Sequence, residues 1–252
     1  MKEISPNQSN IRNDIVYEVN SQTPFTGFVI EHYDTGGIHF KSCYKDGVPN
    51  GPYETYHENG QLSSKVTYKD GVQDGPYERY YEDGQLRSKV TYKDDFKDGP
   101  YETYYENGQL QERGTYKDDE GGSVQRLLWR LSKEEGSKPA IKPDETYEKY
   151  IKRDGPYEAY YDNGQLQEKV TFKNAKPDGP YETYHENGQL KVKGTYKDGF
   201  IDGPFEDYYE NGQLELKGTD KDGKLDGPFE RYHPNGELEE KRTYKDGIRW
   251  TL

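Results

Sequence analysis

The chain has 252 residues, a formal net charge of −13 and a single cysteine, Cys43. Binding to nucleic acid phosphates or to anionic lipid requires clustered Lys and Arg, so this acidity argues against both. One cysteine excludes an intrachain disulfide and a cysteine-based metal site, and we expect Cys43 to be a small, half-buried structural residue.

Residues 1–26 form a lead-in before the periodic part of the chain. Between Met1 and Asn20 there is no apolar run of the length that a signal peptide or a membrane span requires. The sequence therefore predicts a protein without a membrane segment, located in the cytoplasm. A secreted or surface-exposed location is the alternative if a leader precedes this chain.

A 24-residue unit, G-P-Y-E-x-Y-Y-E-N-G-Q-L-x-x-K-x-T-Y-K-D-G, fills most of the remaining sequence. A degenerate copy begins at Gly27, and clear copies begin at Gly51, Gly75, Gly99, Gly155, Gly179, Gly203 and Gly227. A fixed period of this length indicates a repeat array. We expect one block of repeats at 27–121 and a second block at 146–252.

Each unit contains two alternating segments and two turn signals. Asn59-Gly60 and Asp70-Gly71 both predict type I′ turns of two residues, which join antiparallel strands. The resulting cross-strand pairs are Tyr53–Val66, Glu54–Lys65, Thr55–Ser64, His57–Leu62 and Glu58–Gln61. This register places Tyr53, His57, Leu62, Val66 and Tyr68 on one face, and Glu54, Tyr56 and Lys65 on the other.

The predicted fold is all-β: an elongated repeat array of antiparallel β-hairpins that forms a twisted, meandering sheet. The 26 tyrosines support order despite the low aliphatic content, because a tyrosine buries its ring while its hydroxyl stays wet. The cross-strand Glu–Lys match recurs as Glu78–Lys89, Glu102–Arg113, Glu158–Lys169, Glu182–Lys193, Glu206–Lys217 and Glu230–Lys241. Each such pair contributes about 0.2–1 kcal/mol.

The strings Gly-Pro-Tyr-Glu-x-Tyr-Tyr-Glu-Asn-Gly-Gln-Leu and Gly-x-Tyr-Lys-Asp-Gly resemble the bacterial variant of the MORN repeat. Tandem arrays of this variant define the YwqK-like antitoxin family, and the resemblance covers about Gly27 to Gly247 with one interruption. It implies a twisted sheet of successive hairpins. It also implies neutralisation of a partner toxin, such as a nuclease or a deaminase.

The interruption, at 122–145, is an insertion or a diverged repeat. Val124, Leu127, Leu128 and Leu131 follow helical spacing between Ser123 as N-cap and Gly136 as C′ residue, so a short amphipathic helix competes with a diverged strand. Its role is either to pack on the sheet or to dock a partner. Arg126, Trp129 and Arg130 are the candidate docking residues, because Trp and Arg are enriched at interface hot spots.

No catalytic or metal-binding pattern stands out. His57, His185 and His233 occupy a repeat position that elsewhere holds tyrosine, and the Asp-Gly pairs lack the ligand series of a calcium loop. We therefore expect no enzyme activity and no cofactor.

The sequence favours a protein-binding repeat protein, and we expect an antitoxin or immunity protein that binds a basic toxin domain. A generic scaffold or adhesion-related repeat protein is the alternative. We expect a monomer that binds neither nucleic acid nor membranes. The candidate partner-binding residues on the sheet are tyrosines that share a face with the Glu–Lys pairs: Tyr80, Tyr104, Tyr160, Tyr184 and Tyr208.

Overall fold

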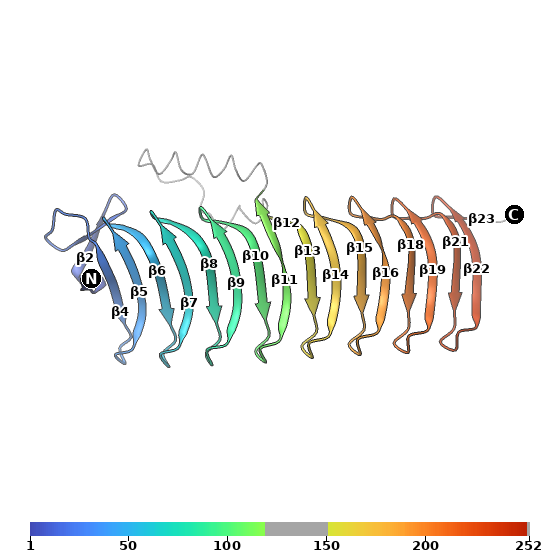
Figure 1. The fold of residues 1–252 in the computed structure, drawn as a ribbon, viewed down its shortest axis with the longest axis horizontal. Helices are drawn as coiled ribbons and strands as arrows, with labels where there is room; N and C mark the ends of the chain where they lie inside the picture. The colour runs from blue at the N-terminus through green and yellow to red at the C-terminus, as the bar shows by residue number, and fades with distance from the viewer. Residues whose placement is uncertain (119–150, 251–252) are drawn as a thin grey trace. The chain divides into compact units, whose positions relative to one another are not determined.

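The computed structural model describes residues 1–118 and 151–250 (Figure 1). Contacts divide the chain into two compact units, residues 1–108 with 116–152 (unit 1) and residues 109–115 with 153–252 (unit 2). The predicted insertion at 122–145, with its helix and with Arg126, Trp129 and Arg130, lies outside the described residues. Among the described residues, no helix has the length and apolarity that a membrane span requires.

Unit 1 contains a short 3₁₀ helix and a series of antiparallel hairpins. Its elements are β1 (Glu3–Ile4), η1 (Pro6–Gln8), β2 (Ser9–Arg12), β3 (Ile15–Glu18), β4 (Gly27–His32), β5 (Ile38–Lys45), β6 (Val48–Tyr56), β7 (Leu62–Lys69), β8 (Val72–Tyr80), β9 (Leu86–Lys93) and β10 (Phe96–Tyr104). From β4 to β10, each strand pairs with the next one along the chain. The hairpin array predicted from the 24-residue period is therefore confirmed in this unit.

Unit 2 repeats the same arrangement. Its strands are β13 (Gly155–Tyr160), β14 (Leu166–Lys173), β15 (Lys176–Tyr184), β16 (Leu190–Lys197), β17 (Phe200–Ile201), β18 (Gly203–Tyr208), β19 (Leu214–Lys221), β20 (Lys224–Leu225), β21 (Gly227–Tyr232), β22 (Leu238–Lys245) and β23 (Ile248–Trp250). Two strands, β11 (Leu110–Asp118) and β12 (Ile151–Arg153), contribute residues to both units. In each unit the hairpins form an all-β array with turns at two opposite edges (Figure 1).

In the repeats whose second turn lies within the described residues, that turn is the predicted two-residue type I′ turn. At Asp70-Gly71, both central residues have positive φ, +49° and +84°, and Lys69 pairs with Val72. The same geometry holds where the repeat lacks glycine: Ala175 adopts φ +64° after Asn174 at +52°. A left-handed conformation costs a non-glycine residue about 1–2 kcal/mol, so Ala175 is a strained position.

Replacing Ala175 by glycine should raise the free energy of unfolding by about 0.5–1 kcal/mol, because relief of the strain exceeds the added flexibility of the unfolded chain. Urea denaturation of the full-length chain measures this change. Asp95, at φ +71°, is the matched comparison. Its side chain accepts a hydrogen bond from the Gln73 amide at 2.6 Å. Asp95→Gly should therefore gain less than Ala175→Gly, and equal gains would contradict the explanation.

The first turn of each repeat differs from its prediction, and the type I′ assignment there is wrong. Only Gly60 has positive φ, +83°, and its amide donates to the His57 carbonyl at 2.9 Å. The His57 amide in turn donates to the Gln61 carbonyl at 2.8 Å. This is a three-residue loop of a type I turn followed by a left-handed glycine. The Asn59 carboxamide oxygen stabilises it by accepting the Gln61 amide at 2.9 Å.

A bulge restores the register that the longer loop would otherwise shift. Tyr56, not His57, lies opposite Leu62, and the pairing then steps to Thr55 with Ser64, leaving Ser63 as the extra residue. Leu62 therefore shares a face with Tyr56, contrary to the prediction. The inner pairs Tyr53–Val66, Glu54–Lys65 and Thr55–Ser64 are confirmed.

One face of each hairpin, the Tyr–Val face, carries the residues equivalent to Tyr53, Val66 and Tyr68. Val66 is 4% exposed, and the rings of Tyr53 and Tyr68 lie 6.3 Å apart. In unit 2 the buried cluster on this face consists of Tyr157, Ala159, Val170 and Tyr181, with partly buried Phe172, Val192, Tyr196 and Ile201 against it. Aromatic and β-branched packing across strands is thus the core of the array.

The histidine position of the repeat connects each hairpin to the next. The hydroxyls of Tyr33 and Tyr81 donate to the carbonyls of Tyr56 and Tyr104, at 2.6 and 2.7 Å. His185 Nε2 lies 2.9 Å from the Tyr208 carbonyl in the same manner. Tyrosine and histidine exchange at this position because both side chains can donate a hydrogen bond to that carbonyl.

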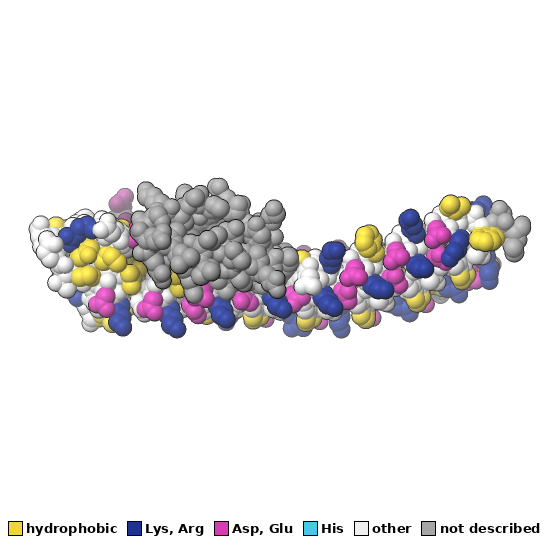
Figure 2. Space-filling view, turned by 90° about the horizontal axis from the view of Figure 1, so that it is seen from above, with side chains coloured by type: hydrophobic (Ala, Val, Ile, Leu, Met, Phe, Trp, Pro, Cys, Tyr) yellow, Lys and Arg dark blue, Asp and Glu magenta, His cyan; other side chains and the backbone are white. Residues whose placement is uncertain are grey.

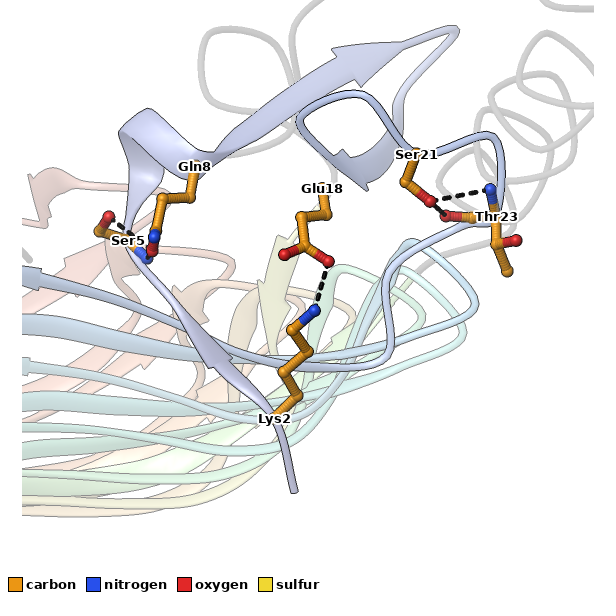
Figure 3. Close-up of polar contacts among 6 residues, drawn as sticks. All are labelled: Lys2, Ser5, Gln8, Glu18, Ser21 and Thr23. Carbon is orange, nitrogen blue, oxygen red and sulfur yellow. Dashed lines mark hydrogen bonds and ion pairs between the residues drawn. The ribbon is translucent and has the colours of Figure 1, made fainter.

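The lead-in, 1–26, folds over one edge of unit 1. Strand β1 pairs in parallel with β4, and Ile4, Val16, Phe25 and Val29 form a buried cluster. Polar contacts hold this segment together: Lys2 pairs with Glu18, and Ser5 bonds Gln8 (Figure 3). Covering an edge strand removes a template for unwanted pairing, as terminal caps of repeat proteins do.

Candidate protein-binding surface

The predicted partner-binding tyrosines lie on the Glu–Lys face, which is the side of each hairpin that carries the residues equivalent to Glu54, Tyr56 and Lys65. All five of them are half-buried. Each donates its hydroxyl to the glutamate two residues earlier: Tyr80 to Glu78 at 2.8 Å, Tyr104 to Glu102 at 2.8 Å, Tyr160 to Glu158 at 2.5 Å, Tyr184 to Glu182 at 2.6 Å, and Tyr208 to Glu206. The structure places them in equivalent positions along each unit, with only part of each ring open to a partner.

These hydroxyls stay protonated at neutral pH. Burial, together with the hydrogen bond to the neighbouring glutamate, raises the pKa of Tyr80 and of Tyr104 to about 12. For Tyr184, the bond to Glu182 comes first among the causes, and the pKa again rises to about 12. The tyrosines therefore act as fixed donors, and a partner meets ring edges in place of free hydroxyls.

The Glu–Lys pairs form continuous ladders across strands. In unit 1, Lys65 lies opposite both Glu54 and Glu78, and the Lys65–Glu54 distance is 3.1 Å. In unit 2, Glu230 binds Lys217 and Lys241, each at 2.8 Å. The predicted cross-strand pairs at Glu78–Lys89, Glu158–Lys169, Glu182–Lys193, Glu206–Lys217 and Glu230–Lys241 are confirmed. Because the charges alternate, this face carries little net charge.

The unbalanced acidity lies at the edge of the first turns. Six of the first turns expose a carboxylate directly before the Asn-Gly or Asp-Gly pair: Glu58, Glu82 and Glu106 in unit 1, and Asp162, Glu186 and Glu210 in unit 2. None of the turn sequences from the histidine or tyrosine to the glutamine contains Lys or Arg. We call this row the acidic edge.

The opposite edge, formed by the second turns, carries both signs of charge. Lys69 precedes Asp70, Lys197 precedes Asp198, and in Figure 2 basic and acidic side chains alternate over unit 2. The two edges of the array therefore differ in charge, although their turns have similar lengths. The acidic edge was not predicted from the sequence. The absence of Lys and Arg from every first turn is the signal that would have indicated it.

Side chains in the first turns also connect neighbouring repeats. The Asn187 side-chain amide donates a hydrogen bond to the Glu210 carbonyl at 2.9 Å. The Gln165 side chain lies against Gly188, so a Cβ on Gly188 would be only 2.6 Å from Gln165 Oε1. Asn59 and Asn163 make the equivalent bonds to the next repeat. The turns therefore stack in a fixed order, which holds the exposed carboxylates of the acidic edge at regular intervals within each unit.

The family model described as "MORN repeat variant" matches this chain at residues 49–70, 73–94, 97–118, 153–174, 177–198, 201–219 and 225–246. Together these segments make up more than half of the sequence. The chain belongs to the MORN repeat variant family. No curated protein is significantly similar to this MORN variant chain.

Two solved structures share weak similarity with the MORN variant array. A chain of the TcdB2–TccC3–Cdc42 crystal structure is 12% identical over 91% of this chain, with a TM-score of 0.23, and this chain spans only 12% of that one. A porin-like protein from Bacteroides uniformis is 9% identical, with coverages of 92% and 89% and a TM-score of 0.20. Scores this low carry no argument about fold or function.

The MORN variant repeats hold their histidines apart. Within residues 1–118 and 151–250, no group of three or more His, Cys, Asp or Glu side chains is placed to hold a metal ion. His39 Nδ1 lies 2.8 Å from Glu31, and Cys43 is half-buried, with a thiol pKa raised by burial. These contacts are local and structural.

Acid should weaken the MORN variant ladders. Hydrogen bonds from Lys193 and then Tyr208 lower the pKa of Glu206, and Lys217, Lys241 and Tyr232 lower that of Glu230 to about 2. A carboxylate whose pKa is lower when folded stabilises the fold above its unfolded pKa of 4.5, and that contribution is lost as pH falls below 4.5. The urea midpoint should therefore fall between pH 5 and pH 3.

The Glu206→Gln variant isolates the contribution of the Glu–Lys ladder to this loss of stability in acid. It should show a shallower fall over that pH range than the unchanged protein, because one of the groups that must be protonated is absent. An identical pH profile for the variant would contradict the assigned role of Glu206.

Proposed function

We propose that this MORN variant protein binds a basic protein partner along its acidic edge, and that it acts as an antitoxin or immunity protein by neutralising a toxin domain such as a nuclease or a deaminase. The observation that carries the proposal is the row of exposed carboxylates without Lys or Arg in the same turns. The resemblance to the antitoxin family supports the role, and the family membership agrees with a repeat protein that binds other molecules.

The spacing of the acidic edge suits long-range attraction. Successive first turns are two strands apart, which is about 10 Å for strands about 4.8 Å apart. That distance is close to the Debye length of about 10 Å at 0.1 M salt, so the fields of neighbouring carboxylates overlap near the surface. A partner with clustered Lys or Arg would be drawn to this edge and would associate faster.

The Glu–Lys face supplies contact area beside that edge. Its tyrosine rings border the first turns, because Tyr80 pairs with Leu86 and Tyr184 pairs with Leu190, next to the loops. Rings held in place by hydrogen bonds lose little entropy on binding. We therefore propose that the carboxylates speed association and that the half-buried tyrosines contribute contact after docking.

The test uses a purified basic nuclease or deaminase domain encoded next to this gene. Increasing amounts of the full-length MORN variant protein are added, and the toxin's activity on its substrate is measured. The proposal predicts inhibition that saturates near one equivalent, and rescue of growth when both proteins are expressed together. Full toxin activity with excess protein would contradict the antitoxin role. Binding without inhibition would assign the array to a scaffold instead.

A further inference from the structure

One hairpin of unit 2 departs from the repeat on its Tyr–Val face. The position that holds Tyr68 in the second hairpin, and tyrosine or phenylalanine in the other repeats, holds Asp220. In the other hairpins this ring packs against the aromatic residue fifteen positions earlier, as in Tyr181–Tyr196 at 4.5 Å and Phe229–Tyr244 at 5.8 Å. Phe205 therefore lacks the aromatic neighbour that its equivalents have.

The place of the missing ring is part of an open depression of about 430 Å³, which we call the cavity. Phe205, Phe229 and Tyr244 supply aromatic walls, and Asp207 and Asp220 supply carboxylates. The Phe205 ring lies over Gly218, where a Cβ would approach it to 2.8 Å. Glycine stands at this position in three repeats, at Gly114, Gly194 and Gly218, so Asp220 is the departure that distinguishes this hairpin.

One of the two carboxylates, Asp220, is not satisfied by the protein. Asp220 Oδ1 is buried without a hydrogen-bond partner among the described residues, and neither Asp207 nor Asp220 has an ion-pair partner there. The other acid of the cavity, Glu240, pairs with Arg242. Arg231 also lines the cavity, opposite Glu240, and is exposed to solvent. A buried acceptor without a donor is unfavourable, and a bound donor would remove that cost.

Burial raises the pKa of Asp220, and burial followed by the nearby Glu215 raises that of Asp207. Both groups are therefore partly removed from water before any ligand arrives. A cation placed at Asp220 would gain from this desolvated setting, and an apolar stem would gain from the aromatic and leucine walls.

We propose that this cavity is a subsite for one lysine side chain of a protein partner, with the stem along Phe205 and Phe229 and the ammonium at Asp220. The stem takes the space that a tyrosine ring fills in the other hairpins. Aromatic faces beside the stem add a cation–π contribution. The subsite is on the face opposite the Glu206–Lys217 ladder, because Asp207 alternates with Glu206 along β18, so it is separate from the surface proposed above.

The test titrates N-acetyl-lysine-N-methylamide into the full-length protein and follows backbone amide shifts in β18, β19, β21 and β22 by NMR. The neutral N-acetyl-norleucine-N-methylamide is the matched probe. We expect saturable shifts with a Kd of about 1–10 mM for the lysine probe and at least tenfold weaker binding of the norleucine probe. No saturable shifts, or equal binding of both probes, would overturn the proposal.

Two variants locate the binding. Asp220→Asn keeps the shape and should weaken the lysine probe at least tenfold, while Asp220→Tyr should abolish binding by filling the cavity. Asp246→Asn, in a second turn outside the cavity, is the control and should leave the Kd unchanged. Retained binding in Asp220→Tyr would overturn the proposal. Tighter binding of spermidine than of the lysine probe would also overturn it, because the cavity would then be a polyamine site. Tighter binding of the N-acetyl-glutamate analogue would overturn it as well, because the cavity would then be a site for an acidic group. The results of these probe-binding experiments do not depend on whether the protein neutralises a toxin.

Discussion

Replacing Tyr181 by alanine should lower the free energy of unfolding of unit 2 by about 3–4 kcal/mol. The Tyr181 side chain is 7% exposed and belongs to the buried cluster with Tyr157, Ala159 and Val170. Its ring also lies 4.5 Å from that of Tyr196. Truncation removes this packing and leaves a cavity that two neighbouring hairpins share, so the effect should spread beyond one strand.

Urea denaturation gives the size of the Tyr181 effect, and hydrogen exchange gives its location. We expect faster exchange of amides in β14, β15 and β16 than in the β-strands of unit 1. Phe200→Ala is the matched control, because Phe200 is an aromatic residue of the same unit with 60% exposure. It should change stability by less than about 0.5 kcal/mol. Similar losses for the two variants would show that burial on the Tyr–Val face does not hold the array together.

Replacing Asp220 by tyrosine should have the opposite effect and raise the free energy of unfolding by about 2 kcal/mol. The change removes a buried oxygen without a hydrogen-bond partner, which costs about 1–3 kcal/mol, and it fills the cavity beside Phe205. It also restores the aromatic pair of the other hairpins. A stabilising return to the repeat consensus would mean that Asp220 is kept at a cost in stability, as binding sites often are.

The control for this change separates the charge from the cavity. Asp220→Asn removes the charge but fills no space, so it should recover less of the stability than Asp220→Tyr. Urea midpoints of the three proteins, measured at pH 7, decide the order. A lower midpoint for Asp220→Tyr than for the unchanged protein would contradict the account of the cavity as a vacated ring position.

The period and the hairpin pattern could be predicted from sequence because they depend on local turn chemistry and alternation. Asp70-Gly71 adopts the turn that its residues favour, and Glu54 lies opposite Lys65 as expected. The first turn could not be predicted in the same way. Asn59 uses its side chain to accept the Gln61 amide, and this contact favours a longer loop over the type I′ turn.

The error at the first turn did not spread through the register, because Ser63 is bulged and compensates for the extra loop residue. A bulge of this kind has no signature in the repeat sequence, so the face of Leu62 was predicted wrongly. The five candidate tyrosines were placed on the correct face, since Glu78 and Tyr80 are two residues apart on one strand. The hydrogen bonds from these tyrosines to glutamate are apparent only in the structure.

The acidic edge and the Asp220 cavity are two further features that were not predicted from the repeat sequence. Comparing repeats emphasises what they share, while the cavity lies where one repeat departs from the others at Asp220. The edge is shared by six repeats, yet it becomes visible only when the turns are stacked. Both features follow from residues that the sequence shows and from neighbours that only the fold supplies.

The most direct test of partner binding at the acidic edge is the association rate constant of a charge-neutralised variant. Glu82→Gln, Glu186→Gln and Glu210→Gln are combined in one protein, and Asp198→Asn, Asp222→Asn and Asp246→Asn in a control of equal net charge. Asparagine keeps the left-handed turn conformation of the control positions. Stopped-flow binding to the basic toxin domain at low salt should be about tenfold slower for the first variant and nearly unchanged for the control. Equal slowing of both variants would show that net charge alone acts, and unchanged rates in both would contradict the acidic edge as the binding surface.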